Sequence, residues 1–186
     1  MKGEAPASVP CVVMKPLLAL ILVAAPLFSQ EILTQTHVLR PQGLQSDFPA
    51  LTAAADGTPH IAYVQWDGEK DTLHLAKLDD GVLSDVLTIG QPGIIHQPAI
   101  ATDGNGTQHV IWSQVNQKDL MELRAAQIPD GRLQGETTTL AAAATGGHAF
   151  AKTATSPTGD VWCVYQGMRG GTADVFCRVF EAKKKT

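Results

Sequence analysis

Three side chains in the sequence have types and positions suited to binding a ligand, because each adjoins a predicted turn. Trp66 comes just before an Asp-Gly pair, and an exposed indole ring beside a loop can stack on the face of a sugar. Arg132 follows a second Asp-Gly pair and Arg169 precedes a Gly-Gly pair, and a guanidinium group can form paired hydrogen bonds with a carboxylate. These three are therefore the candidate ligand-binding residues; the alternative for Trp66 is a scattered surface aromatic.

A second piece of chemistry concerns Cys163 and Cys177. Segments 160–166 and 174–180 are expected to form a hairpin whose turn is centred near Gly170, and the two cysteines are equally distant from that centre. Directly opposed residues of an antiparallel pair have Cα atoms within the range that a disulfide can bridge. We expect a cross-strand disulfide here; the alternative is two buried thiols.

The elements that must position these residues come from an internal repeat. The stretch 57–63 (GTPHIAY) recurs without a gap at 106–112 (GTQHVIW) and more weakly at 159–165 (GDVWCVY), a period of about 50 residues. Pro-Ala-Leu at 49–51 recurs as Pro-Ala-Ile at 98–100. The matching columns give structural roles within the repeat to Asp56 and Asp103, to His60, His109 and Trp162, and to Tyr63, Trp112 and Tyr165.

The polar members of these columns could also suggest catalysis or metal binding. Asp56 and Asp103 lie beside turns, where a short carboxylate side chain bonds its own backbone, and we expect that role for them. His60 and His109 align with Trp162, which favours packing over ligation because a metal site needs three or four converging ligands. We therefore expect no catalytic residue, no metal and no cofactor.

Each repeat divides into four short strand-like pieces separated by turn formers, and no segment beyond residue 29 has a sustained helical stripe. Pieces such as 60–64 are apolar on both faces, as expected of a sheet covered on both sides. The sequence predicts an all-β chain of about three four-stranded antiparallel blades of the β-propeller type. The predicted units are 48–96, 97–149 and 150–182 within a repeat domain at 30–182, with 32–39 as a fourth-strand piece and 183–186 as a Lys-rich tail.

Three blades do not close a ring, since propellers have roughly four to eight. Two explanations remain open at this point. The chain is an open arc or a fragment, or two copies assemble head to tail, each N-terminal strand completing a blade of its partner.

Charge and the N-terminus limit the classes of function. Lys and Arg number 14 against 18 Asp and Glu, a formal net charge of −4, which argues against a general nucleic-acid binder. The apolar run 17–28, with Lys15 before it, predicts a signal peptide at 1–29, of which 1–13 precede an alternative start at Met14. We expect a secreted or periplasmic protein with no stable membrane span after cleavage; the alternative is an uncleaved anchor.

In the repeated Pro-Ala-Leu/Ile, Asp, Gly, His and Tyr/Trp positions described above, the chain resembles the sialidase-like propellers with BNR-type repeats. In that family the turn between the third and fourth strands often carries a Ser-x-Asp-x-Gly-x-Thr-Trp motif; here turns 79–83 and 129–133 keep the Asp-Gly but neither the Ser nor the Trp. The resemblance implies the fold more than an activity. We predict a non-catalytic binding or interaction module for carbohydrate or an envelope protein. The alternatives are a sialidase-like glycoside hydrolase, or a fragment of one, and a purely structural repeat.

Overall fold

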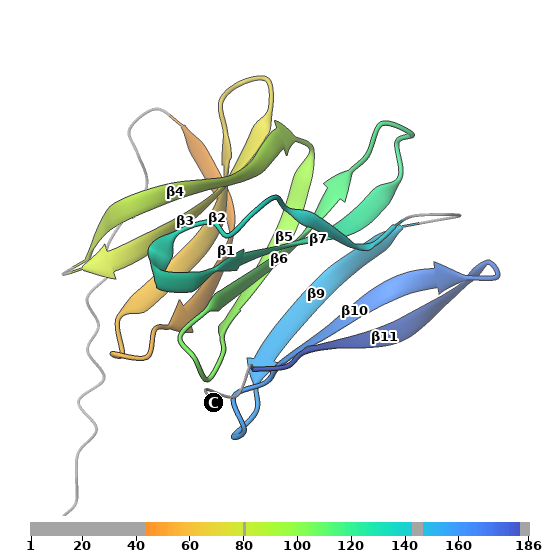
Figure 1. Cartoon of the computed structure of the whole chain (residues 1–186). Coiled ribbons are helices and arrows are strands. Elements are labelled where there is room, and N and C mark those ends of the chain that lie inside the picture. The colour runs from red at the N-terminus through yellow and green to blue at the C-terminus, as the bar shows by residue number, and fades with distance from the viewer. Residues whose placement is uncertain (1–43, 80, 143–146, 183–186) are drawn as a thin grey trace, which may run out of the picture. The chain divides into compact units, whose positions relative to one another are not determined.

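The computed structural model describes residues 44–79, 81–142 and 147–182, all within one compact unit, His37–Thr186. These residues form three antiparallel sheets (Figure 1). The first sheet has the order β1 (Gln45–Ala53), β2 (Pro59–Trp66), β3 (Asp71–Asp79) and β4 (Val82–Gly93). The second has β5 (Ile95–Thr102), β6 (Gln108–Val115), β7 (Met121–Ile128) and β8 (Thr138–Ala141). The third has β9 (His148–Thr155), β10 (Val161–Arg169) and β11 (Thr172–Phe180).

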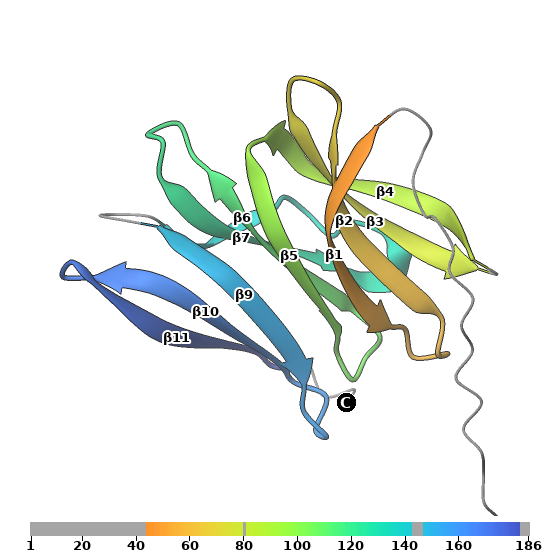
Figure 2. The same ribbon diagram turned by 180° about the vertical axis from the view of Figure 1, so that it is seen from behind.

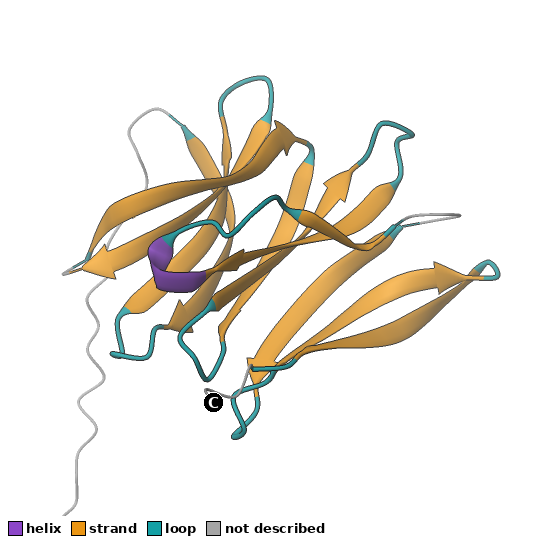
Figure 3. Cartoon of the chain, in the orientation of Figure 1, coloured by secondary structure: helices purple, strands orange, loops and turns teal. Residues whose placement is uncertain are grey.

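The predicted fold class is confirmed: the described chain is all-β, with four-stranded antiparallel sheets of the propeller type. Figure 3 shows strands throughout, interrupted within the described ranges by one 3₁₀ turn, η1 (Pro129–Gly131). The third sheet has three described strands. The predicted signal peptide at 1–29, the strand piece at 32–39 and the tail at 183–186 lie outside the described residues.

The same turn closes the first hairpin of each sheet. The N–H groups of Gly57, Gly106 and Gly159 donate to the carbonyl oxygens three residues earlier, at 2.9, 3.0 and 2.9 Å. Their φ angles are 85°, 88° and 91°, in the left-handed region that glycine enters without a Cβ clash. The repeat in the sequence therefore corresponds to a repeated backbone conformation.

The sheets stack face to face, so the second sheet is covered on both sides. Trp112, Val110 and Ile128 pack toward the first sheet against Val64 and Leu73. A second apolar layer joins the second and third sheets and includes Ile111, Leu123, Ala151, Cys163 and Tyr165. Consequently β6 is buried from Gln108 to Gln114, which explains why this strand is apolar on both faces.

The first strands of the three sheets, β1, β5 and β9, lie side by side (Figure 2). The Thr153 hydroxyl donates to the Ile100 carbonyl oxygen at 2.9 Å and so ties β9 to β5. Each of these strands has a bulge at the same repeat position, where Phe48, Gln97 and Phe150 have φ of 53°, 44° and 58°. Bulges turn a side chain away from its regular alternation, and they do so here at the start of all three strands.

Candidate functional site

The antiparallel order of the strands divides the connections between two ends of the sheets. The β2–β3, β6–β7 and β10–β11 turns and the β4–β5 connection lie at one end, here called the pocket end (Figure 1). Trp66 and Arg169 lie at this end, on the first and third sheets. Arg132, in the β7–β8 connection, lies at the opposite end. The structure therefore does not bring the three predicted ligand-binding residues together, and Arg169 forms an exposed ion pair with Asp174 at 2.7 Å.

A cleft of about 650 Å³ opens at the pocket end between the end of β4 and the β6–β7 hairpin. Its lining comes from two sheets. The described lining residues are Gln91, Pro92, Gly93, Gln114, Val115, Asn116, Gln117, Lys118, Glu122, Arg124 and Ala142.

Gln114 connects the cleft to the core. Its Oε1 accepts a hydrogen bond from the indole Nε1 of buried Trp112 at 3.1 Å, and its Nε2 donates to the Gln91 carbonyl oxygen at 3.2 Å. A Cβ on Gly93 would lie 2.8 Å from that same Nε2, so the end of β4 approaches the amide closely because residue 93 has no side chain. The floor of the cleft is thus fixed by the packing between the first two sheets.

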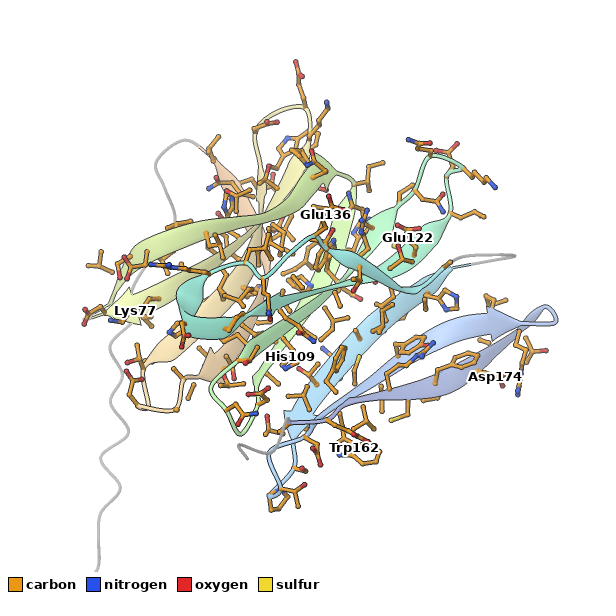
Figure 4. The ribbon with its side chains drawn as sticks, viewed as in Figure 1. Lys77, His109, Glu122, Glu136, Trp162 and Asp174 are labelled. Carbon is orange, nitrogen blue, oxygen red and sulfur yellow. The ribbon has the colours of Figure 1, made fainter. Side chains whose placement is uncertain are left out.

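Charged and amide groups converge on one wall of the cleft. Arg124 Nη1 lies 3.6 Å from Glu122 Oε1, and Arg124 Nη2 donates to the Thr137 hydroxyl at 3.1 Å. Asn116 Nδ2 donates to Glu122 Oε2 at 3.5 Å. Figure 4 shows Glu122 beside this hairpin, well apart from His109. Because the Arg124 and Glu122 side chains stay 26% and 14% exposed, the wall offers both donors and acceptors to a ligand.

The turn beside this wall is held in shape by its own side chain. Asn116 Oδ1 accepts hydrogen bonds from the backbone N–H groups of Lys118 and Leu120, at 2.9 and 3.2 Å. Such a side-chain-capped turn presents Lys118 at the rim of the cleft in a defined loop conformation.

The aromatic column of the repeat occupies equivalent buried positions. Tyr63, Trp112 and Tyr165 lie on β2, β6 and β10, the central strands of their sheets. Tyr63 contacts the His74 ring, with centroids 5.4 Å apart, and Tyr165 stacks on Phe176 at 5.5 Å. Burial raises the pKa of Tyr63 and lowers that of His74, so both groups favour their neutral forms.

The aspartates of the repeat bond the turns that follow them. Asp56 Oδ1 accepts the Thr58 N–H at 2.9 Å, which lowers the pKa of Asp56. Asp103 Oδ1 accepts the Asn105 and Thr107 N–H groups, at 2.8 and 2.9 Å. The second oxygen of Asp103 lies 3.2 Å from His109 Nε2, which links this turn to β6.

The histidine column varies more than its alignment suggests. His109 is buried against the Phe180 ring, with centroids 4.9 Å apart, and His60 Nδ1 lies against the amide Nε2 of Gln108. Trp162, for which the alignment predicts a structural role, is 48% exposed, on the face of the third sheet opposite to that of buried Cys163. Among the described residues, no three His, Cys, Asp or Glu side chains form a metal-binding group.

The predicted disulfide is wrong. Cys163 pairs with Arg178 and Cys177 pairs with Val164, a register one residue away from the predicted one. Because side chains alternate along a strand, this shift places the two thiols on opposite faces of the sheet. Cys163 is buried, Cys177 is exposed, and both are free.

This placement predicts unequal thiol reactivity. Burial raises the pKa of the Cys163 thiol to about 11, so at pH 8 little of it is the reactive thiolate. Alkylation of the native chain followed by peptide mass spectrometry is expected to modify Cys177 and leave Cys163 unmodified. After unfolding, both peptides should carry the label. Equal native labelling, or a Cys163–Cys177 peptide without reduction, would contradict this register.

Sequence reasoning missed the cleft. Its wall residues stand in β6, β7 and the hairpin between them, and the only local signal was the polar run Asn116–Asp119 between two apolar pieces. Gln91 and Gly93 come from another repeat, and nothing in the sequence pairs them with Gln114.

Within the described ranges, no helix has the length and apolar character needed to cross a membrane.

Comparison with known proteins supports the fold. No protein-family model matches the chain, and no curated protein sequence matches it. A thermostable family-43 glycoside hydrolase matches 78% of the chain with a TM-score of 0.54 at 16% identity. An endo-arabinase from Bacteroides thetaiotaomicron matches 81% with a TM-score of 0.56 at 13% identity. A Hadza microbial sialidase matches 73% with a TM-score of 0.51 at 13% identity.

These similarities concern part of each neighbour. The matches cover 57% of the glycoside hydrolase, 61% of the endo-arabinase and 31% of the sialidase. At such low identity a common fold does not carry a common activity. The chain therefore shares a propeller-type architecture with carbohydrate-active enzymes over less than two thirds of their lengths.

Proposed function

We propose that the chain is a non-catalytic carbohydrate-binding module, and that the cleft between β4 and the β6–β7 hairpin binds the sugar. The observation that carries the proposal is the convergence of Arg124, Glu122 and Asn116 on one wall of this cleft. The proposal includes export of the chain, which rests on the signal peptide predicted at 1–29.

The chemistry of the wall suits a polyhydroxylated ligand. Each sugar hydroxyl donates one hydrogen bond and accepts others, so its site needs both kinds of partner. Arg124 and Lys118 donate, the Glu122 carboxylate accepts, and the amide of Gln117 does both. A cleft with a few fixed polar groups is the usual form of a small-molecule site. The structural neighbours, which include a glycoside hydrolase and a sialidase, agree with a carbohydrate ligand.

Hydrolysis is the second candidate, favoured by the names of those same neighbours. The usual mechanism uses two carboxylates roughly 5 to 9.5 Å apart. The described lining of the cleft pairs one carboxylate, that of Glu122, with the cations of Lys118 and Arg124. This composition suits recognition better than bond cleavage, so binding is the preferred proposal.

The test is titration of the full chain with a panel of neutral and acidic oligosaccharides by calorimetry. Hydrogen bonds to charged groups contribute about 1.5–3 kcal/mol, so Arg124→Ala is expected to weaken binding by about tenfold or more. Arg132→Ala removes the same side chain at the opposite end and should leave affinity unchanged.

Three results would discriminate between the candidates. Absence of binding across the panel, or equal losses in the Arg124 and Arg132 variants, would overturn the cleft as the site. Release of shorter sugars by the wild-type chain, lost in Glu122→Gln while binding persists, would establish hydrolysis instead. Thermal melts of all variants check that the Thr137 contact of Arg124 is not the cause of the loss.

A further inference from the structure

The third sheet has an apolar outer face, the face turned away from the second sheet. Its apolar members are Trp162, Val164, Val175, Cys177 and Val179, which the β10–β11 register places together; the polar side chains of Gln166 and Lys152 lie on the same face. Val175 is 81% exposed and Val164 is 42% exposed. Figure 4 shows Trp162 on this sheet, on the side away from the other two. A contiguous exposed apolar face of this kind marks an interaction surface.

The repeat indicates what covers such a face. Val164 is the counterpart of Ala62 in the first sheet and Ile111 in the second. Ala62 is buried where the second sheet packs on the first, and Ile111 is buried where the third packs on the second. At both internal contacts this face therefore receives the next sheet of the same kind.

The first sheet carries the complementary side of that contact. Tyr63 is the counterpart of Trp112 and Tyr165, which in the two internal contacts lie on the sheet that packs onto the preceding one. Leu51 is the counterpart of Ile100, which is buried in the first contact, yet Leu51 is 65% exposed. The chain thus has both halves of one sheet–sheet contact, one on its first sheet and one on its last.

The fourth strands give the same direction. β4, the last strand of the first sheet, is followed in the chain by β5 of the second sheet. β8, the last strand of the second sheet, is followed by β9 of the third. A fourth strand therefore comes directly before the first strand of the next sheet. The segment 32–39 stands in this position before β1 and shares a hydrophobic column with Leu87 and Leu140 through Val38. The third sheet has the described order β9, β10, β11, one strand fewer than the first and second sheets.

We propose that a second copy of this chain docks head to tail on the third sheet. Its first sheet covers the outer face, and its segment 32–39 pairs with the edge of β11 that has no neighbour among the described strands. The contact is used twice in a closed dimer, because each copy offers one donor side and one receiving side. Such pairing removes an exposed strand edge and an apolar surface in one step.

The test measures the solution mass of the full chain by size exclusion with light scattering across a dilution series. We expect twice the chain mass for the wild type. Val164→Glu places a charge at the centre of the outer face. In the single chain this carboxylate lies beside Lys152, which pairs with position 164 across β9 and β10 and offsets its charge. This variant is expected to weaken the dimer about 30-fold or more, as loss of a central interface contact does.

Matched variants separate docking from general effects. Ile94→Glu changes an exposed isoleucine in the β4–β5 connection and should leave the dimer intact. In-frame deletion of 32–39 should yield single chains, and mixing that variant with Val164→Glu should restore mixed dimers, because one intact contact remains. Circular dichroism verifies that each variant is folded.

Single-chain mass for the wild type would overturn the proposal. This holds also if deletion of 32–39 lowers stability, because segment 32–39 would then pair within its own chain. A dimer unaffected by Val164→Glu or by the deletion would overturn it as well. Sugar titration of the same variants tests the proposed sugar site independently of the dimer, because the cleft lies between the first and second sheets of one copy.

Discussion

Replacing Trp112 with alanine is expected to lower the free energy of unfolding by about 3–5 kcal/mol, the usual cost of deleting a large buried aromatic side chain. Trp112 is fully buried in the apolar layer between the first two sheets. The substitution also leaves Gln114 Oε1 without the indole donor it accepts from. Urea unfolding monitored by circular dichroism measures the loss, and the melting temperature is expected to fall by roughly 10 °C.

Trp66 supplies the matched control. It is the same residue type, but it is exposed at the end of β2 and outside both apolar layers. Trp66→Ala is therefore expected to cost less than about 1 kcal/mol. If the two substitutions were equally costly, the packing between the first and second sheets would not be the main source of stability.

The fold class could be predicted because the repeat is visible residue by residue. The three matching stretches became β2, β6 and β10, and the glycines that end the preceding turns share one conformation. The bulges could not be predicted in the same way. Phe48, Gln97 and Phe150 are residue types that do not favour positive φ, so local preference does not account for their conformations.

The cysteine prediction failed by a single residue of register. The β10–β11 hairpin pairs Arg169 with Thr172, which sets its centre between Gly170 and Gly171. A centre at Gly170 itself would have paired the cysteines. Because strand side chains alternate with a period of two, half a residue in the turn decides whether two thiols face each other or lie on opposite faces.

The location of Arg132 was also within reach of the sequence. Trp66 and Arg169 adjoin turns after the second strand of a unit, whereas Arg132 adjoins a turn after the third strand. In an antiparallel sheet such turns lie at opposite ends, so strand counting separates them. The cleft was not within reach, because Gln91 and Gln114 meet through packing between two sheets.

Replacing Gly159 with alanine tests the contact between the second and third sheets. The backbone N–H of Gly104 donates to the Gly159 carbonyl oxygen at 2.9 Å, and a Cβ on Gly159 would lie 2.7 Å from Gly104 Cα. Backbone atoms cannot move aside as a flexible side chain can, so the two turns must separate. Adding the clash to the left-handed backbone cost gives an expected loss of about 2–5 kcal/mol.

Gly57→Ala isolates the clash from the backbone cost. Gly57 has nearly the same φ, 85° against 91°, but an added Cβ there meets no atom within 4 Å. Its substitution should cost about 1–2 kcal/mol, the left-handed penalty alone. Hydrogen exchange gives a local readout: Gly159→Ala should remove protection of the Gly104 amide, whereas Gly57→Ala should not. Equal stability losses with a protected Gly104 amide would mean that the two turns do not hold these sheets together.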